Sequence, residues 1–155
     1  MDYLTVIAWL VALSSGLMAG TYFAFSSFIM QSLKALDGLE GMRTMNSINE
    51  VILRSMFMPL FFVSTVLALA LAGGGLWTWG EPDSLWATAA GSIYVIGMFG
   101  VTAVFNVPLN NALAKAGGES NPEQVWAHYC TVWTRWNSIR AVASLMTFTM
   151  CLKLL

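Results

Sequence analysis

Four long runs of apolar residues follow one another along this chain, and they cover residues 3–30, 56–79, 85–107 and about 136–152. A helix needs about 20 residues, with a range of roughly 17–25, to cross a hydrocarbon layer of ~30 Å. Each run reaches that length. The pattern therefore predicts an all-α membrane protein with four transmembrane helices in a single domain over residues 1–155.

Two segments between these runs have a different pattern. Residues 38–54 and 122–136 mix charged and apolar residues at helical spacing, which is typical of amphipathic helices. Asn121, Pro122 and Glu123 form a typical helix start, with a cap, a proline at the first helical position and an acid in the first turn. We expect both segments to lie at the membrane interface or to extend a span into the cytosol.

The basic residues predict the orientation. Between spans one and two, and between or just inside spans three and four, lie Lys34, Arg43, Arg54, Lys115, Arg135 and Arg140. The other side of the membrane has only Lys153. Because Lys and Arg concentrate on the cytosolic side, we expect a multi-pass protein of the cell membrane with both termini outside and both amphipathic segments cytosolic. The start of the chain lacks a basic region and cleavage site typical of a signal peptide, so the first run is expected to be a permanent span.

The two halves of the chain resemble each other. Each contains a span, an amphipathic segment and a second span. A shift of 80 residues aligns Gly20, Phe25, Leu33 and Gly38 with Gly100, Phe105, Leu113 and Gly118. This predicts two parallel helical-pair repeats related by an axis along the membrane normal.

Composition narrows the partners. Hydrophobic residues make up 57% of the chain and charged residues 10%, so lipid is the expected surroundings. The net charge of −1 disfavours nucleic acid. Cys130 and Cys151 fall on opposite sides of the predicted topology, which argues against a disulfide. The spacing of His, Cys, Asp and Glu suits no metal ion, so we expect no metal and no cofactor. Four short spans bury little surface, which leaves a homo-oligomer open.

Polar side chains form matching stripes on the first and third spans. The stripes consist of Thr102, Asn106 and Asn110 and, 80 residues earlier, Tyr22, Ser26 and Met30. An amide in hydrocarbon needs hydrogen-bond partners. Pro108 leaves the carbonyl of Val104 without its usual helical bond, so the two asparagines either repair that kink and hold helices together or line a pocket. Both interpretations stay open.

The last amphipathic segment carries the most informative pattern. Helical spacing places on one face Trp126, Tyr129, Trp133, Asn137, Arg140 and Ser144, with His128 on the opposite face. Arg140 lies ~20 Å along the helix from Lys153, which is inside the cytosolic leaflet unless its side chain extends to the interface. An intramembrane arginine indicates a functional site. We expect it to point inward, with Asn137, Asn106, Asn110 and a carboxylate such as Glu50 as partners.

Several of these residues belong to longer strings that resemble the DUF1772 family of small membrane proteins, also called anthrone-oxygenase-like. The strings are GTYFAFS at 20–26, M-x-x-I-N at 45–49, FNVPLNNAL at 105–113 and WTRWNSIR at 133–140. The resemblance implies an oxygenase, because characterised relatives oxidise an anthrone to an anthraquinone with O₂, without metal or flavin. Many relatives have a histidine where this chain has Ser138, so a histidine base at that position is missing here.

These observations lead to three hypotheses. The first is a cofactor-independent oxygenase that acts on a flat aromatic, anthrone- or quinol-like substrate in a polar and aromatic pocket near the cytosolic leaflet. Its candidate catalytic residues are Arg140, Asn106, Asn110 and Asn137 as an oxyanion site, with Tyr22 or Tyr129 as base. Its candidate substrate-binding residues are Trp126, Tyr129, Trp133, Ser26 and Asn49. The alternatives are a module that binds or transports a small amphipathic molecule, and a structural or accessory membrane subunit without catalysis.

Overall fold

The first apolar run folds as one uninterrupted helical rod that is longer than expected. The computed structural model describes residues 3–116 and 121–155. In it, α1 (Tyr3–Ala24), the π-helical turn η1 (Phe25–Ile29) and α2 (Met30–Lys34) follow each other without a break. A short turn leads to α3 (Gly38–Ile52), whose first turn is capped by the Asp37 carboxylate, 3.1 Å from the Leu39 amide. The predicted amphipathic helix at 38–54 is therefore present.

The chain breaks between α3 and α4 (Phe57–Trp77) at residues 53–56, which we call the α3–α4 corner. Pro59 lies in the first turn of α4, and its ring would collide with the carbonyl of Ser55 in a continuous helix. The Ser55 hydroxyl caps the end of α3 and the start of α4. It donates to the Ile52 carbonyl at 2.9 Å and accepts from the Phe57 amide at 3.2 Å. The break is thus encoded locally.

The third run forms a second rod from α5 (Ser84–Tyr94), the π-helical segments η2 (Val95–Gly100) and η3 (Thr102–Asn106), and α6 (Val107–Lys115). The last helix, α7 (Pro122–Lys153), is continuous through the predicted amphipathic segment and the fourth apolar run. Its start is capped as expected, since the Asn121 side chain accepts from the Gln124 amide at 3.4 Å. Of the two placements expected for residues 122–136, the structure has the one in which they extend the next helix.

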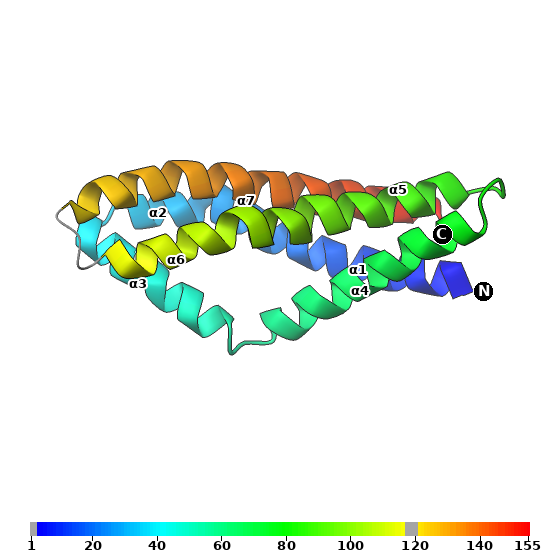
Figure 1. Cartoon of the computed structure of the whole chain (residues 1–155), viewed down its shortest axis with the longest axis horizontal. Helices are drawn as coiled ribbons and strands as arrows, with labels where there is room; N and C mark the ends of the chain where they lie inside the picture. The colour runs from blue at the N-terminus through cyan, green and yellow to red at the C-terminus, as the bar shows by residue number, and fades with distance from the viewer. Residues whose placement is uncertain (1–2, 117–120) are drawn as a thin grey trace.

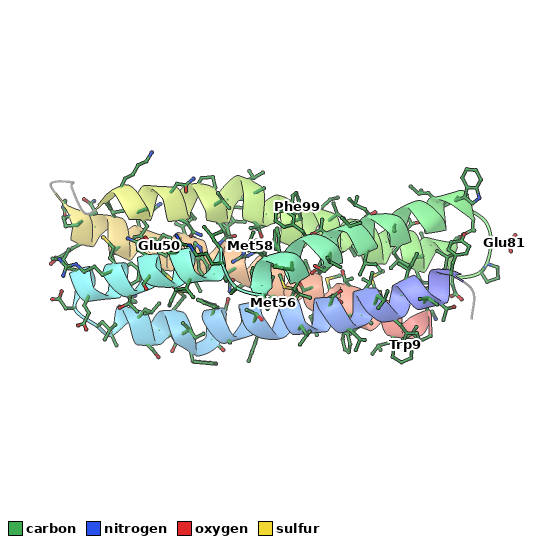
Figure 2. The ribbon with its side chains drawn as sticks, turned by 90° about the horizontal axis from the view of Figure 1, so that it is seen from below. Trp9, Glu50, Met56, Met58, Glu81 and Phe99 are labelled. Atoms are coloured by element: carbon green, nitrogen blue, oxygen red, sulfur yellow. The ribbon has the colours of Figure 1, made fainter. Side chains whose placement is uncertain are left out.

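The helices form an elongated bundle (Figure 1). α7 packs along α1 and also contacts α5, while α4 packs against both α5 and α1. The ends of the chain and the turn between α4 and α5 lie at one end of the bundle, and α2, α3 and α6 lie at the other (Figure 1). At the α3–α4 corner the chain projects away from the other helices. Figure 2 shows Met56 of this corner between Glu50 and Trp9 along the long axis.

The surface and the helix lengths are those of a membrane protein. Within the described residues, three helices are long and apolar enough to cross a bilayer: Tyr3–Lys34, Phe57–Trp77 and Ser84–Lys115. Large apolar side chains such as Leu17, Val66 and Ile96 are exposed on their outer faces. α7 is not among the three, and its apolar part contains the polar residues Asn137, Ser138 and Arg140. The fourth crossing, the two-repeat arrangement and a homo-oligomer therefore stay predictions.

Two expectations about charged and sulfur side chains can be compared with the structure directly. Arg140 is buried inside the bundle, so it does not belong with the basic residues that predict orientation. The five that remain on that side still outnumber Lys153. Cys130 and Cys151 are free and buried, which agrees with the expectation of no disulfide.

Candidate functional site

A cavity of about 360 Å³ lies beneath the α3–α4 corner, between that corner and the helices α1, η3 and α7. Its apolar wall is aromatic and includes Phe25, Phe57, Phe61, Phe62, Phe99 and Trp133. Its polar side chains are Thr21, Tyr22, Asn49, Thr102, Asn110, Asn137 and Arg140. Cavities of this size and character suit small aromatic ligands.

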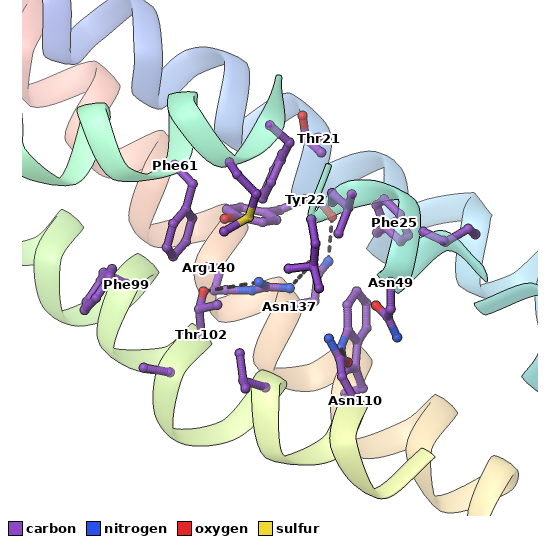
Figure 3. A pocket seen from close by; sticks show the side chains of 18 of the residues that line it. Thr21, Tyr22, Phe25, Asn49, Phe61, Phe99, Thr102, Asn110, Asn137 and Arg140 are labelled. Carbon is purple, nitrogen blue, oxygen red and sulfur yellow. Dashed lines mark hydrogen bonds between the residues drawn. The ribbon is translucent and has the colours of Figure 1, made fainter. Parts of the chain in front are cut away.

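Arg140 stands at the centre of the polar wall (Figure 3). It is 6% exposed, and its guanidinium donates to Thr102 Oγ1 at 3.2 Å and to Asn137 Oδ1 at 2.7 Å. The guanidinium carbon lies 4.3 Å from the centre of the Tyr22 ring and 5.3 Å from that of Trp133, both within cation–π range. The predicted inward direction of Arg140 and its predicted contact with Asn137 are thus present in the structure.

The other predicted partners of Arg140 do not contact it. Asn106 and Asn110 form their bonds elsewhere, and Glu50 is exposed. Across residues 3–116 and 121–155, Arg140 has no carboxylate within ion-pair distance, and its Nε is buried without a hydrogen-bond partner. The expectation of a carboxylate partner such as Glu50 was wrong, because that residue lies on the outer side of α3.

Asn137 connects α7 to the first helical rod. Its amide nitrogen donates to the Tyr22 carbonyl at 2.7 Å and to Ser26 Oγ at 2.6 Å. Its carbonyl oxygen accepts from Arg140. Both N–H groups and the carbonyl oxygen of the amide are therefore hydrogen-bonded, which fixes its orientation. Ser138 Oγ also donates to Ser26, at 2.9 Å. Ser26 therefore orients Asn137, and it is not among the residues that line the cavity.

Asn110 is held in a similar way at the other end of the polar wall. Its carbonyl oxygen accepts from the Tyr129 hydroxyl and from the Trp133 indole nitrogen, both at 2.8 Å. This fixes the amide orientation without ambiguity, because both partners are donors. The amide nitrogen, which forms no bond of its own, belongs to the side chain that lines the cavity beside Asn49 (Figure 3).

Asn106 lies behind the cavity wall and does not line it. Its amide nitrogen donates to the Trp133 carbonyl at 3.3 Å, so it ties η3 to α7. Within the described residues, both asparagine side chains form their hydrogen bonds with α7, and none with the Val104 carbonyl. Of the two interpretations of these asparagines, Asn106 matches the joining of helices and Asn110 the pocket lining.

The aromatic face of α7 is buried as the spacing predicted, but only part of it reaches the cavity. Trp126 stacks on Tyr129 and Tyr129 on Trp133, each with ring centres 5.8 Å apart. Trp126 and Tyr129 are buried among Met30, Met42 and Leu113, and only Trp133 lines the cavity. His128 is exposed, as expected.

The two tyrosines that are candidate bases lie in different surroundings. Tyr22 presents the face of its ring to the guanidinium, and its hydroxyl is buried without a hydrogen-bond partner among the described residues. Burial raises the pKa of the Tyr129 phenol, which lies before the last apolar run, and its hydroxyl donates to Asn110. The Tyr129 phenol therefore keeps its proton in this arrangement.

Sequence reasoning missed the aromatic wall contributed by α4 and η2. Phe57, Phe61 and Phe99 line the cavity, and Phe61 stacks on Phe57 with ring centres 6.1 Å apart. In a uniformly apolar run, a phenylalanine that faces lipid has the same sequence signature as one that faces a cavity. Thr102 was noted as part of the stripe on the third span, but its bond to Arg140 depends on how α7 packs.

The cavity thus combines a buried cation, an amide donor and aromatic walls. Its described lining contains no aspartate, glutamate, histidine or cysteine, and the described residues contain no group of three such side chains that would hold a metal ion. Arg140 and the amide of Asn110 can stabilise negative charge on a ligand oxygen. The aromatic rings can stack on a flat ligand.

A comparison with protein families gives a match over residues 50–150, to the model described as Anthrone oxygenase. The matched region contains Thr102, Asn110, Asn137 and Arg140, whereas Tyr22 lies before it. Searches of curated proteins and of solved structures give no match. Because the family model covers well over half of the chain, this protein belongs to the anthrone oxygenase family.

Proposed function

We propose that this protein is a cofactor-independent oxygenase that oxidises a flat anthrone- or quinol-like substrate in the cavity. Family membership supports an anthrone-oxygenase-like function. The observation that carries the finer proposal is Arg140, a buried cation that faces an aromatic cavity and has no carboxylate partner among the described residues. Burying an unpaired charge inside a membrane protein costs desolvation free energy. A bound anion or a developing negative charge in a reaction would offset that cost.

The reaction needs stabilised negative charge and O₂. For an anthrone, loss of one proton from the CH₂ group gives an enolate whose oxygen would lie against Arg140. The carbon of this anion reduces O₂ and forms a C–O bond, and the resulting peroxide anion takes up one proton from water, in place of the one lost in the first step, to give a hydroperoxide. Loss of water from the hydroperoxide breaks the O–O bond and the second C–H bond and leaves a ketone. In total, CH₂ and O₂ give C=O and H₂O, with O₂ accepting four electrons.

In this proposal Arg140 binds the enolate oxygen, and Asn137 and Thr102 hold the guanidinium in place. The distances of 2.7 and 3.2 Å to these two side chains support a fixed position for the cation. Asn110 donates to a second oxygen of the substrate, and Trp133 and Phe61 contact its faces. Fixed donors that stabilise developing charge account for large parts of enzymatic rate accelerations.

O₂ enters from the bilayer beside the α3–α4 corner, and the substrate enters there from the interface of the cytosolic leaflet. Leu53 and Phe62 line the cavity and are also 64% and 53% exposed. Met56 at the corner is 81% exposed. Apolar side chains around an opening suit contact with hydrocarbon, in which both O₂ and flat aromatic molecules dissolve well.

The proposed topology has four crossings, with α7 as the fourth and the α2–α3 end in the cytosol. α7 runs beside α1, which belongs to a helix that is apolar enough to span. Each of these rods has 32 residues, or about 48 Å at 1.5 Å per residue, which exceeds a hydrocarbon layer of ~30 Å. The exposed Trp77 and Trp79 at the opposite end suit the outer interface.

The test is oxygen consumption by the purified protein in lipid nanodiscs with 1,8-dihydroxyanthrone, corrected for the spontaneous rate in empty nanodiscs. We expect one O₂ consumed and one anthraquinone formed per substrate. Arg140→Gln should lower the rate by about 100-fold, as for loss of one oxyanion donor. Arg135→Gln removes an exposed arginine of the same helix and should leave the rate unchanged.

A wild-type rate equal to that of empty nanodiscs would remove oxygenation of this substrate class from consideration. Saturable binding of the anthrone without O₂ consumption would instead favour a binding or transport module. If Arg140→Gln lowered thermal stability and no ligand stabilised the wild type, an accessory membrane subunit would be favoured.

A further inference from the structure

We infer that the cavity binds its ligand as an anion formed before binding, so that the ligand charge balances Arg140. This inference rests on the proposed function for the identity of the ligand, a planar hydroxylated aromatic molecule. It adds the ionisation state of that ligand and the place where the proton is lost. The arrangement of charges and of hydrogen-bond donors around the cavity carries it.

The first observation is the charge of the cavity wall. Arg140 is 6% exposed and has no carboxylate partner in the described chain. Its contacts are with the neutral groups of Thr102, Asn137, Tyr22 and Trp133. These contacts orient the guanidinium and leave its charge uncompensated. An anion in the cavity would supply the missing charge in a medium where charge pairing is strong.

The second observation is the excess of unused donors. A guanidinium has five N–H groups, and two hydrogen bonds from Arg140 are present, while its Nε is buried without a partner. The carbonyl oxygen of Asn137 is taken by Arg140, and that of Asn110 by Tyr129 and Trp133. Asn137 has no group left over, and the remaining capacity at Arg140 and Asn110 is that of donors, which suits an oxyanion better than a hydroxyl group.

The third observation is the lack of a proton acceptor. The described residues that line the cavity include no aspartate, glutamate or histidine. Tyr22 turns its ring face toward the cation, and the Thr102 hydroxyl donates to the Met98 carbonyl at 2.7 Å. A neutral phenol or enol in the cavity would thus have no side chain ready to take its proton. The proton is instead lost to water at the membrane interface before entry.

The experiment uses alizarin, a dihydroxyanthraquinone that already has both ring ketones and changes colour when it loses its first phenolic proton. The wild-type protein in nanodiscs is titrated into alizarin one pH unit below the midpoint of the dye in empty nanodiscs. There about one-tenth of the dye is ionised, because one pH unit corresponds to a tenfold ratio. On saturation with protein, we expect more than half of the bound dye to show the spectrum of the anion.

Variants assign the effect to Arg140. Arg140→Gln should bind the dye with the ionised fraction of empty nanodiscs, and Arg140→Lys should retain part of the shift because it keeps the charge. Arg135→Gln should behave as wild type. A measurement on the wild type alone guards against misfolded variants: the affinity for alizarin should fall about tenfold per pH unit well below the midpoint, while that for unsubstituted anthraquinone should not change.

Binding of alizarin with an unchanged ionised fraction, or a shift that persists in Arg140→Gln, would overturn the inference, as would failure to bind alizarin at any pH. The proposed oxygenation can fail separately. A protein that ionises alizarin on binding but consumes no O₂ with the anthrone keeps the anion site and loses the oxygenase. Oxygen consumption without any spectral shift keeps the oxygenase and loses the anion site.

Discussion

The two halves of the chain differ in the helical stretch that follows the first long rod of each half. This stretch is broken in the first half and continuous in the second. Residues 38–77 form α3 and α4 with a break at the α3–α4 corner, whereas residues 122–153 form the single helix α7. Both stretches follow a long apolar rod, at 3–34 and 84–115. The broken stretch projects away from the bundle, and the unbroken one packs along α1 (Figure 1).

This difference separates two tasks. The break leaves the space that becomes the cavity, and it contributes the aromatic residues Phe57 and Phe61. The unbroken helix contributes the polar residues Asn137 and Arg140, which need a rigid support to keep their hydrogen-bond distances. A continuous helix at 38–77 packed like α7 would fill the space between the rods, and the cation would then have no cavity to face.

The largest effect should come from a bulky side chain that fills the cavity. We place it on η3, which belongs to the half of the chain without the break. Ala103 lines the cavity on η3, so Ala103→Phe should displace a ligand and lower oxygenase activity by about 100-fold, since small misplacements at a reacting centre can cost that much. Steady-state oxygen consumption measures this. Val104→Phe is the matched control, because Val104 is 62% exposed and does not line the cavity. Equal losses in both variants would contradict the location of the site.

The next effect concerns the contact between α7 and the first rod. Asn137→Ala removes the bonds to Tyr22 and Ser26 and leaves Arg140 with less support, so we expect a loss of about 3 kcal/mol in the free energy of unfolding. Unfolding in a denaturing detergent measures it. Asn111→Ala, at an exposed position, should change nothing. A neutral Asn137→Ala would mean that α7 does not depend on this amide.

A smaller effect should follow at a close contact between the two halves, where α5 packs against α4. A methyl group on Gly91 of α5 would overlap the Ala68 carbonyl and approach Ala72 of α4, so Gly91→Ala should destabilise the protein by about 2 kcal/mol through overpacking. The midpoint of thermal unfolding in detergent checks this. Gly73→Ala is the control, since nothing lies within 4 Å of an added methyl group there. Unchanged stability of Gly91→Ala would show that α4 and α5 can separate at low cost.

The smallest effect is expected at the break itself. Ser55→Ala removes the hydroxyl that bonds to Ile52 and Phe57, with an expected loss of about 1 kcal/mol, as for a helix cap. Because Pro59 still prevents a continuous helix, oxygenase activity should remain. Chemical denaturation and oxygen consumption measured on the same preparation separate the two outcomes. A large loss of activity would mean that these two hydrogen bonds hold the cavity open.

The sequence by itself determined which segments are helical, that the first three apolar runs are long and apolar enough to span, and which face of α7 is buried. These follow from local periodicity, because a 3.6-residue repeat places Trp133, Asn137 and Arg140 together whatever surrounds them. The helix caps at Asp37 and Asn121 and the effect of Pro59 are equally local.

Only the tertiary structure decided which side chains contact Arg140. Its bond to Thr102 joins residues 38 positions apart, and the bond from Asn137 to Tyr22 joins residues 115 positions apart. No pattern within one helix ranks Glu50, Asn106 and Thr102 as partners, because the choice depends on how α3, η3 and α7 rotate against each other. The same packing put the phenylalanines of α4 around the cavity, since a uniformly apolar run does not encode which of its sides faces lipid. It also left the cation without a carboxylate partner among the described residues.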